Sequence, residues 1–317
     1  MDFNKFKELY QKKEVQHFQH QVSSKPLVSV LVQTYNHEFY IKQCLDAILA
    51  QKTNFDFEIL LGEDVSTDKT REICLEYAQN YPKKIRLFLH HPANKIRVMD
   101  VVTGNFNAFY NLYKARGKYI AFCEGDDYWT DPLKLQKQVD YLENNSEYAL
   151  VYHKFKEECE TQTDLRKTLK QPSKDLSQEE LFKLTYHPLL STVCFRNILK
   201  NLPEEIIQVI NVDSFLLSLL GSIGKAKFQP EIKSSIYRRH SGGIWTSEQK
   251  KIRLKSKCHT YKKIITYNSH KQNWIIVNAF RSKLKNHLKT QILYYYRLRN
   301  FKEFWISLLD YFIIKFK

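Results

Sequence analysis

Close cysteine pairs are missing from this sequence of 317 residues. Its six cysteines lie at least thirty positions apart, with no C-x-x-C pair and no histidine partner at zinc-finger spacing. Secreted disulfide frameworks and structural zinc sites both depend on such spacings, so neither is expected. The chain is also long enough to bury a full hydrophobic core without cross-links. We therefore predict reduced thiols and a cytoplasmic protein.

Long apolar runs are missing as well. The opening MDFNKFKELYQKKE alternates charged and bulky side chains and has no continuous apolar core of the kind found in secretion signals. No window contains the roughly eighteen uncharged apolar residues that a membrane-spanning helix requires. Even the C-terminal FWISLLDYFIIKF is interrupted by Asp310 and Lys315. We expect neither export by that route nor an integral membrane protein.

Acidic residues are scarce in one part of the chain. Residues 247–317 contain 17 Lys and Arg but only three acidic residues, and therefore carry +14 of the total net charge of +16. The other 246 residues are nearly neutral, which argues against binding nucleic acid over the whole surface. The sequence predicts a near-neutral domain with a cationic appendage.

The order of predicted elements indicates an α/β fold with a mostly parallel sheet and helices on both faces. Continuous apolar segments, typical of strands buried on both faces, alternate with helical patterns in residues 26–123. These predicted strands are residues 27–33, 57–61, 85–90 and 118–123. Residues 154–176 are polar and rich in lysine, and we expect a loop there. We expect three parts: an N-terminal amphipathic helix and linker (1–25), a main domain (26–245) and a basic helical tail (246–317).

Polar loops follow three of the predicted strands. TYNH follows the first strand, GEDVSTD the second and EGDDYW the fourth. Ligands of such sheets bind beyond the carboxyl ends of the strands, so the loops should converge on one crevice. Asp126 and Asp127 suit Mg2+, which is held by one or two carboxylates together with substrate phosphates. The alternative is a simple turn, which Gly-Asp-Asp also favours.

Four motifs resemble those of family 2 glycosyltransferases, which have the GT-A fold. They are VSVLVQTYN, EDVSTD, ARGKYIAFCEGDD and SSIYRRHSGG, and they occur in that order between about residues 26 and 245. The resemblance implies an inverting enzyme that moves a sugar from a nucleotide diphosphate donor, with UDP as the expected carrier, to an acceptor hydroxyl of a bacterial surface glycan.

The resemblance also implies roles for residues around the donor. Asp126 and Asp127 match the carboxylates that hold Mg2+ or Mn2+ against the donor diphosphate, and Asp126 counts among the donor-binding residues as well. Asp64 matches the aspartate that recognises uracil, although it could instead cap the following helix. Tyr35 matches the ring that packs on the base, although loop packing is the alternative. Its neighbours Thr34 and Asn36 are expected to contact the donor too.

Three further positions belong to the implied site. Asp213 in NVDSFLL matches the base that removes the acceptor proton, with helix capping as a rival role that could also hold. His240 lies in a segment resembling one that closes over the donor phosphates, where it could contact the metal or the diphosphate. Trp129 could stack on the acceptor sugar or simply pack in the core.

The arginine-containing segment often found ahead of the metal loop in that family is not evident. The sequence has NKIRVMDVVTGNFN in its place, and whether Lys95, Arg97 or Asn105 substitutes for the arginine is left open.

The basic tail combines two apolar stripes at helical spacing with many Lys and Arg. Phe280, Leu284 and Leu288 begin the first stripe, and Phe301 and Trp305 begin the second. Such helices suit an anionic membrane surface, which would place the enzyme beside a glycan or lipid-linked glycan acceptor at the inner face of the cytoplasmic membrane. The alternative is that the stripes dock on the main domain.

Two other classes of protein remain as alternatives. Sugar-phosphate nucleotidyltransferases share a similar sheet and a metal held by aspartate, but they usually have a glycine-rich loop after the first strand, and QTYNHE contains no glycine. A non-catalytic adaptor for membrane or nucleic acid is suggested by the pI near 9.4. Charge confined to the tail and acidic residues at the crevice oppose it, so no nucleic-acid partner is expected.

Overall fold

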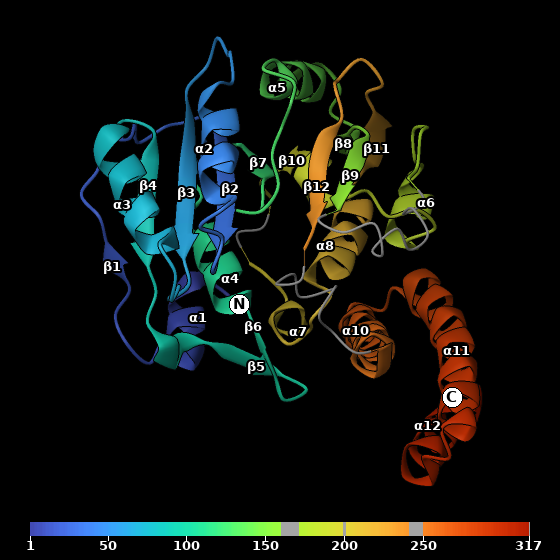
Figure 1. Cartoon of the computed structure of the whole chain (residues 1–317). Helices are drawn as coiled ribbons and strands as arrows, with labels where there is room; N and C mark the ends of the chain where they lie inside the picture. Colours follow the sequence, from blue (N-terminus) through green and yellow to red (C-terminus); the bar gives the residue numbers. More distant parts are fainter. Residues whose placement is uncertain (160–170, 199–200, 241–249, 317) are drawn as a thin grey trace.

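The computed structural model describes residues 1–159, 171–198, 201–240 and 250–316. Its centre is a sheet of eight strands. They are β1 (Gln16–His17), β2 (Val28–Thr34), β3 (Phe57–Glu63), β4 (Ile85–Leu89), β7 (Tyr119–Phe122), β8 (Tyr148–Tyr152), β10 (Cys194–Arg196) and β11 (Lys225–Phe228). Their order is β1-β4-β3-β2-β7-β10-β8-β11, and β4, β3, β2 and β7 run parallel (Figure 1).

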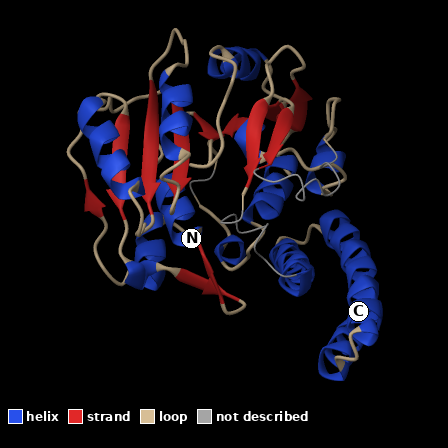
Figure 2. Ribbon diagram, in the orientation of Figure 1, coloured by secondary structure: helices blue, strands red, loops and turns tan. Residues whose placement is uncertain are grey.

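Helices cover both faces of this sheet, and two small sheets flank it (Figure 2). The helices are α1 (Phe3–Tyr10), α2 (Ile41–Leu49), α3 (Thr70–Asn80), α4 (Asn105–Lys114), α5 (Lys134–Asn144), α6 (Gln178–Phe182), α7 (Glu204–Ile207), α8 (Val212–Gly221), α10 (Lys250–His270), α11 (Trp274–Arg297) and α12 (Phe301–Phe316). The small sheets pair β5 (Ile96–Val98) with β6 (Val101–Thr103), and β9 (Phe155–Cys159) with β12 (Ser235–Arg239). The predicted α/β fold is confirmed.

Alternate side chains of β2 enter two different cores. Val30 and Val32 pack with side chains of α2, α3 and α5, whereas Leu31 packs with those of α1 and α4. A strand that is buried on both faces is apolar at most positions, which explains the VSVLV of the sequence, and its buried Ser29 donates to Glu58 at 2.6 Å.

The strand β9 corrects one prediction. Residues 155–159 were expected in a polar loop, but they pair in parallel with β12. Glu157 forms an ion pair with Arg239 at 2.7 Å, and Glu158 forms one with Arg238 at 3.1 Å. Opposite charges on neighbouring strands stabilise the pairing, so a segment that is too polar to read as a strand becomes one through its distant partner.

The last three helices form a unit that contacts the main domain through α10 and α11. Ile264 of α10 and Phe280 of α11 are fully buried in the core that includes α4 and α8. His259 and Lys263 of α10 both contact Gln208, which follows α7. Within the described parts of the chain, no helix combines the length and the hydropathy needed to cross a bilayer.

Candidate functional site

The loops that follow β2, β3 and β7 meet at the carboxyl ends of these strands. The backbone N–H of Asp64 donates to the carbonyl of Thr34 at 3.0 Å, and that of Gly125 donates to the carbonyl of Gln33 at 2.9 Å. Neighbouring parallel strands end at the same edge of a sheet, so their loops share one space. The convergence of the three loops that was expected from the sequence is present.

Asp64 lies at one end of this crevice with Lys95 and Tyr35. Lys95 Nζ is 3.6 Å from Asp64 Oδ2 and 4.1 Å from the centre of the Tyr35 ring. Only 7% of Asp64 is exposed, and burial raises the pKa of its carboxyl to about 6, although Lys95 opposes the shift. Tyr35 is 45% exposed, so much of this side chain is open to a ligand.

Of the three residues left open as replacements for the missing arginine, Lys95 lies in the crevice. The Arg97 side chain is exposed and donates to the carbonyl of Asp100 at 3.1 Å. Asn105 is buried, and its amide donates to the carbonyls of Ile207 and Val209. Lys95 is therefore the residue that brings positive charge to Asp64.

Asn36 joins the loop after β2 to the loop after β3. Its backbone N–H donates to Ser66 Oγ at 3.0 Å, and its side-chain oxygen accepts from the N–H of Thr67 at 2.8 Å. Its φ of 53° lies in the left-handed region, which asparagine tolerates better than most residues. The structure thus gives Asn36 a bracing role, and a direct donor contact stays a prediction.

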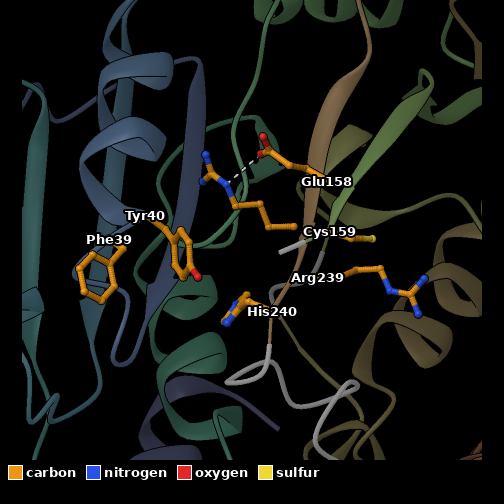
Figure 3. A pocket seen from close by; sticks show the side chains of 7 residues that line it. Phe39, Tyr40, Glu158, Cys159, Arg239 and His240 are labelled. Carbon is orange, nitrogen blue, oxygen red and sulfur yellow. Dashed lines mark hydrogen bonds and ion pairs between the residues drawn. The ribbon is translucent and has the colours of Figure 1, made fainter. Parts of the chain in front are cut away.

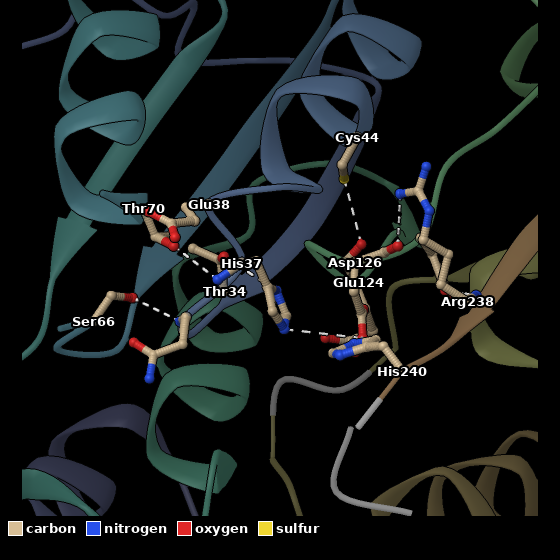
Figure 4. A network of polar contacts seen from close by, with 12 residues as sticks. Thr34, His37, Glu38, Cys44, Ser66, Thr70, Glu124, Asp126, Arg238 and His240 are labelled. Atoms are coloured by element: carbon tan, nitrogen blue, oxygen red, sulfur yellow. Dashed lines mark hydrogen bonds and ion pairs between the residues drawn. The ribbon is translucent and has the colours of Figure 1, made fainter. Parts of the chain in front are cut away.

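Asp126 lies between two histidines that come from different loops (Figure 4). Its Oδ2 is 3.0 Å from His240 Nε2 and 3.9 Å from His37 Nε2. Burial alone would raise the pKa of Asp126, but the hydrogen bond to His240 and the charge of His37 outweigh burial and hold it below its usual value. The three side chains offer ligand atoms that all lie within 4.8 Å of one another.

Asp127 points in another direction. Its Oδ1 accepts a hydrogen bond from the backbone N–H of Arg238 at 3.0 Å, and only 2% of the residue is exposed. Burial and the neighbouring Asp126 raise its pKa well above the usual value. Asp127 therefore joins the loop after β7 to β12, and its role as a metal ligand stays a prediction.

A cavity of about 290 Å³ opens beside His240, between α2 and the small sheet of β9 and β12 (Figure 3). Phe39 and Tyr40 line one side, and Glu158 and Arg238 are among the residues lining the rest. The Tyr40 ring packs on the His240 ring with their centres 4.8 Å apart. His240 therefore borders both the Asp126 cluster and an open space.

Asp213 is the second residue of α8. Its Oδ2 is 3.3 Å from His187 Nε2, and its Oδ1 accepts from the N–H of Ser214 at 2.7 Å. The side chain is 36% exposed and so remains open to a ligand. Its charge also acts on Glu124, whose pKa is raised to about 8 by burial, then by Asp126 and then by Asp213. The negative charges of Asp213 and Asp126 thus act on the same carboxyl group.

Trp129 lies in the core. Only 3% of it is exposed, its indole N–H donates to the carbonyl of Ser191 at 2.9 Å, and Lys134 Nζ lies 4.0 Å from the ring centre. This position favours the packing alternative over contact with an acceptor sugar.

Comparison with known proteins agrees with this geometry. The sequence profile described as Glycosyl transferase family 2 matches residues 29–206, which is more than half of the chain. The chain belongs to glycosyltransferase family 2. This membership favours sugar transfer over nucleotidyl transfer and over a non-catalytic adaptor.

One similar relative of this family 2 chain is an uncharacterized protein of Mycobacterium tuberculosis strain H37Rv. The two are 36% identical over 226 residues, which make up 69% of this chain and 61% of the mycobacterial protein. The chain thus spans about three fifths of the length of that relative.

Two solved structures share the fold at 15% sequence identity. One is residues 1–349 of S. aureus TarS in complex with UDP-GlcNAc, with a TM-score of 0.57 over 90% of this chain and 91% of that one. The other is the mannosyltransferase PcManGT of Pyrobaculum calidifontis with GDP-Man and Mn2+, with a TM-score of 0.53 over 91% of this chain and 81% of that one. At this identity the likeness shows the fold alone.

Sequence reasoning assigned no role to three residues of this family 2 site: His37, Glu124 and His187. The first two stood in motifs that had been noticed, TYNH and EGDD, but the pattern did not say which side chains would meet. His187 lies before η3 (Leu190–Thr192), in a segment with no motif. No signal in the sequence connected it to Asp213.

Proposed function

We propose that this chain is an inverting, metal-dependent glycosyltransferase that moves a sugar from a UDP-sugar to an acceptor hydroxyl. One observation supports this best: Asp64 and Asp126 lie in loops that meet at the carboxyl ends of the parallel strands, and Asp126 lies between two histidines there. Asp64 is suited to recognise a nucleobase, and Asp126 is suited to bind a metal and a diphosphate. Asp213 of α8 is the predicted general base for the acceptor hydroxyl.

Asp64 recognises the nucleobase in this proposal. Its ionised carboxylate accepts a hydrogen bond from uracil N3–H, and Tyr35 packs on the ring of the base. Lys95 keeps part of the Asp64 population ionised because its positive charge opposes the rise in pKa caused by burial. The bound UDP-GlcNAc of TarS, which shares the fold, is consistent with a uracil carrier.

Asp126 and His240 would hold the divalent ion. Asp127, predicted from the sequence as a second carboxylate ligand, accepts a hydrogen bond from the backbone N–H of Arg238 and is left out of this set. These metal-binding atoms fit such an ion because carboxylate and imidazole atoms from different loops lie within 4.8 Å of one another. When bound, Mg2+ or Mn2+ neutralises charge on the departing diphosphate. The mannosyltransferase with the same fold was solved with Mn2+.

Asp213 acts as the general base. It takes the proton from the acceptor hydroxyl as the acceptor oxygen bonds to the anomeric carbon, while the bond from that carbon to the diphosphate oxygen breaks. The electron pair of the broken bond leaves with UDP, and the configuration at the anomeric carbon inverts because the acceptor oxygen attacks from the face opposite UDP. A well-placed base contributes roughly 10²- to 10⁴-fold to the rate.

The acceptor belongs to a bacterial surface glycan or its lipid-linked precursor, and the C-terminal helices bring the enzyme to it. The α12 helix exposes Trp305, Leu309 and other apolar side chains within a segment of net charge +14. Aromatic and basic residues together suit an anionic membrane surface. The enzyme then works in the cytoplasm, peripherally on the inner face of the membrane.

Calorimetric titration of the full chain with UDP, GDP, ADP and CDP, each with and without Mn2+, tests this function. We expect UDP to bind most tightly and its binding to depend on Mn2+. Asp126→Asn should remove the dependence, and Asp140→Asn, which changes an exposed carboxylate on α5, should preserve it.

Two outcomes would contradict the proposed function. One is an Asp126→Ala, Asp127→Ala double variant that consumes UDP-sugar at the wild-type rate in the presence of a chelator. The other is strong, salt-dependent binding of polynucleotide without any binding of a nucleotide sugar.

A further inference from the structure

His37 lies beside the proposed metal site, although the sequence analysis gave it no role. We infer that His37 is a third protein ligand, and that two imidazoles with one carboxylate make this site prefer Mn2+ to Mg2+. This assignment rests on the proposed metal-dependent function and goes further, because it names the residue that determines the choice of ion.

The distances fit one ion with a small adjustment. Ligand atoms that share an ion at about 2.1 Å can be at most about 4.2 Å apart. His240 Nε2 and His37 Nε2 lie 3.0 and 3.9 Å from Asp126 Oδ2, and the largest separation within the set is below 4.8 Å. The set therefore exceeds this limit by no more than about 0.6 Å.

His37 is held so that its Nε2 faces Asp126. The Nδ1 atom lies 3.3 Å from Thr34 Oγ1, and the backbone N–H donates to Thr70 Oγ1 at 2.7 Å. In the tautomer that leaves Nε2 open to a metal, Nδ1–H donates to the Thr34 hydroxyl. Metal-binding histidines usually have such a partner on their other ring nitrogen, because it fixes both the tautomer and the ring orientation.

Gly125 provides the space for this arrangement. A Cβ atom at residue 125 would lie 2.8 Å from His37 Nδ1 and 2.8 Å from Thr34 Oγ1. Real Cβ atoms do not approach other atoms this closely, so any other residue would displace the imidazole or the loop. The metal loop and the loop after β2 are therefore fitted to each other around His37.

The chemistry of the ligands determines the preferred ion. Mg2+ is a hard cation that binds oxygen ligands and keeps much of its water, so nitrogen ligands add little to its affinity. First-row transition ions accept imidazole readily. Replacing a carboxylate by a second imidazole in a three-residue set should therefore favour Mn2+ over Mg2+.

Electron paramagnetic resonance of the full chain titrated with Mn2+ alone measures the affinity, and the electron spin echo reports nitrogen ligands. We expect couplings to two imidazole nitrogens in the wild type and to one in His37→Ala, with Mn2+ binding at least about tenfold weaker in the variant. His270→Ala, which changes an exposed histidine at the end of α10, should match the wild type.

Competition with Mg2+ tests selectivity directly. His37→Asp keeps three ligands, so it should still bind an ion, but the ratio of Mn2+ affinity to Mg2+ affinity should fall towards one. Thermal unfolding without metal checks that each variant folds.

If His37→Ala binds Mn2+ as tightly as the wild type and still shows couplings to two nitrogens, His37 is not a ligand, and the proposed function stays intact. A wild-type chain that binds no Mn2+, with or without UDP, would contradict both.

Discussion

The crevice buries charged side chains, whereas the C-terminal helix α12 exposes apolar ones. At the crevice the residues Asp127 and Asp64 are only 2% and 7% exposed, whereas on α12 Trp305 and Leu309 are each 63% exposed. Withdrawing a carboxylate from water costs free energy unless partners compensate, and exposed apolar surface forgoes hydrophobic stabilisation. At the crevice the chain supplies partial compensation, because Lys95 lies near Asp64 and the backbone N–H of Arg238 donates to Asp127. The exposed face of α12 points instead to a partner outside the chain.

The helices α11 and α12 have nearly the same sequence pattern but differ in the burial of their apolar side chains. Phe280, Leu284 and Leu288 of α11 are buried, whereas Phe301 and Trp305 of α12 are exposed. Both stripes recur at helical spacing, so periodicity identifies an apolar face without naming what covers it. Docking on the rest of the chain therefore describes α11, and the membrane proposal concerns α12.

Removing the proposed base should have the largest effect on the crevice and none on α12. Asp213→Asn should lower kcat by roughly 10²- to 10⁴-fold because the acceptor hydroxyl keeps its proton. Steady-state kinetics with a UDP-sugar measures kcat, and calorimetry measures the affinity for UDP. UDP affinity and vesicle binding should remain as in the wild type.

Asp140→Asn provides the control for Asp213→Asn, since it removes an exposed carboxylate that is bonded to Gln136 of the same helix. Near-normal turnover of Asp213→Asn would exclude Asp213 as the base.

Substitutions on α12 should weaken membrane binding and leave catalysis at the crevice unchanged. Trp305→Ser with Leu309→Ser removes two exposed apolar side chains and should weaken binding to anionic vesicles by roughly 10- to 100-fold. Turnover with soluble donor and acceptor should be unchanged. Co-sedimentation with vesicles containing phosphatidylserine or phosphatidylglycerol measures the partition.

Ile223→Ser is the matched control for α12, because Ile223 is 47% exposed but lies just after α8 on the main domain. Vesicle binding by the α12 variant equal to that of this control would remove α12 from the membrane proposal.

The pH dependence of UDP affinity should be a smaller effect that is specific to Asp64. The ionised carboxylate accepts the uracil N–H more strongly than the neutral acid does, so UDP affinity should fall, by up to about tenfold, as the pH drops through about 6. Because Lys95 lowers the pKa of Asp64, Lys95→Met should move this midpoint to higher pH. Calorimetry of UDP binding between pH 5 and 8 measures the shift.

Arg97→Met is the control for Lys95→Met, since it removes a positive charge from the same segment at an exposed position. An unchanged midpoint in Lys95→Met would contradict the pairing of Lys95 with Asp64.

The sequence predicted the sheet better than it predicted the site. Residues 27–33 were predicted as a strand, and β2 spans Val28–Thr34, because burial on both faces leaves a mostly apolar run. Local pattern also identified the loops that carry Asp64 and Asp126. It could not show that His37 meets Asp126 or that His187 meets Asp213, since these contacts depend on distances across the folded sheet. The strand β9 was missed because its charges are balanced on β12, far along the chain.

Trp129 gives the smallest expected effect and tests where the crevice ends and the core begins. Its indole N–H donates to the Ser191 carbonyl, so Trp129→Phe leaves a buried acceptor with one partner fewer. Loss of that hydrogen bond should lower the free energy of unfolding by about 1 kcal/mol. The KM for the acceptor should not change, because a ring that is 3% exposed and covered by Lys134 offers no face to a sugar. A raised acceptor KM at unchanged stability would instead return Trp129 to the acceptor side of the crevice.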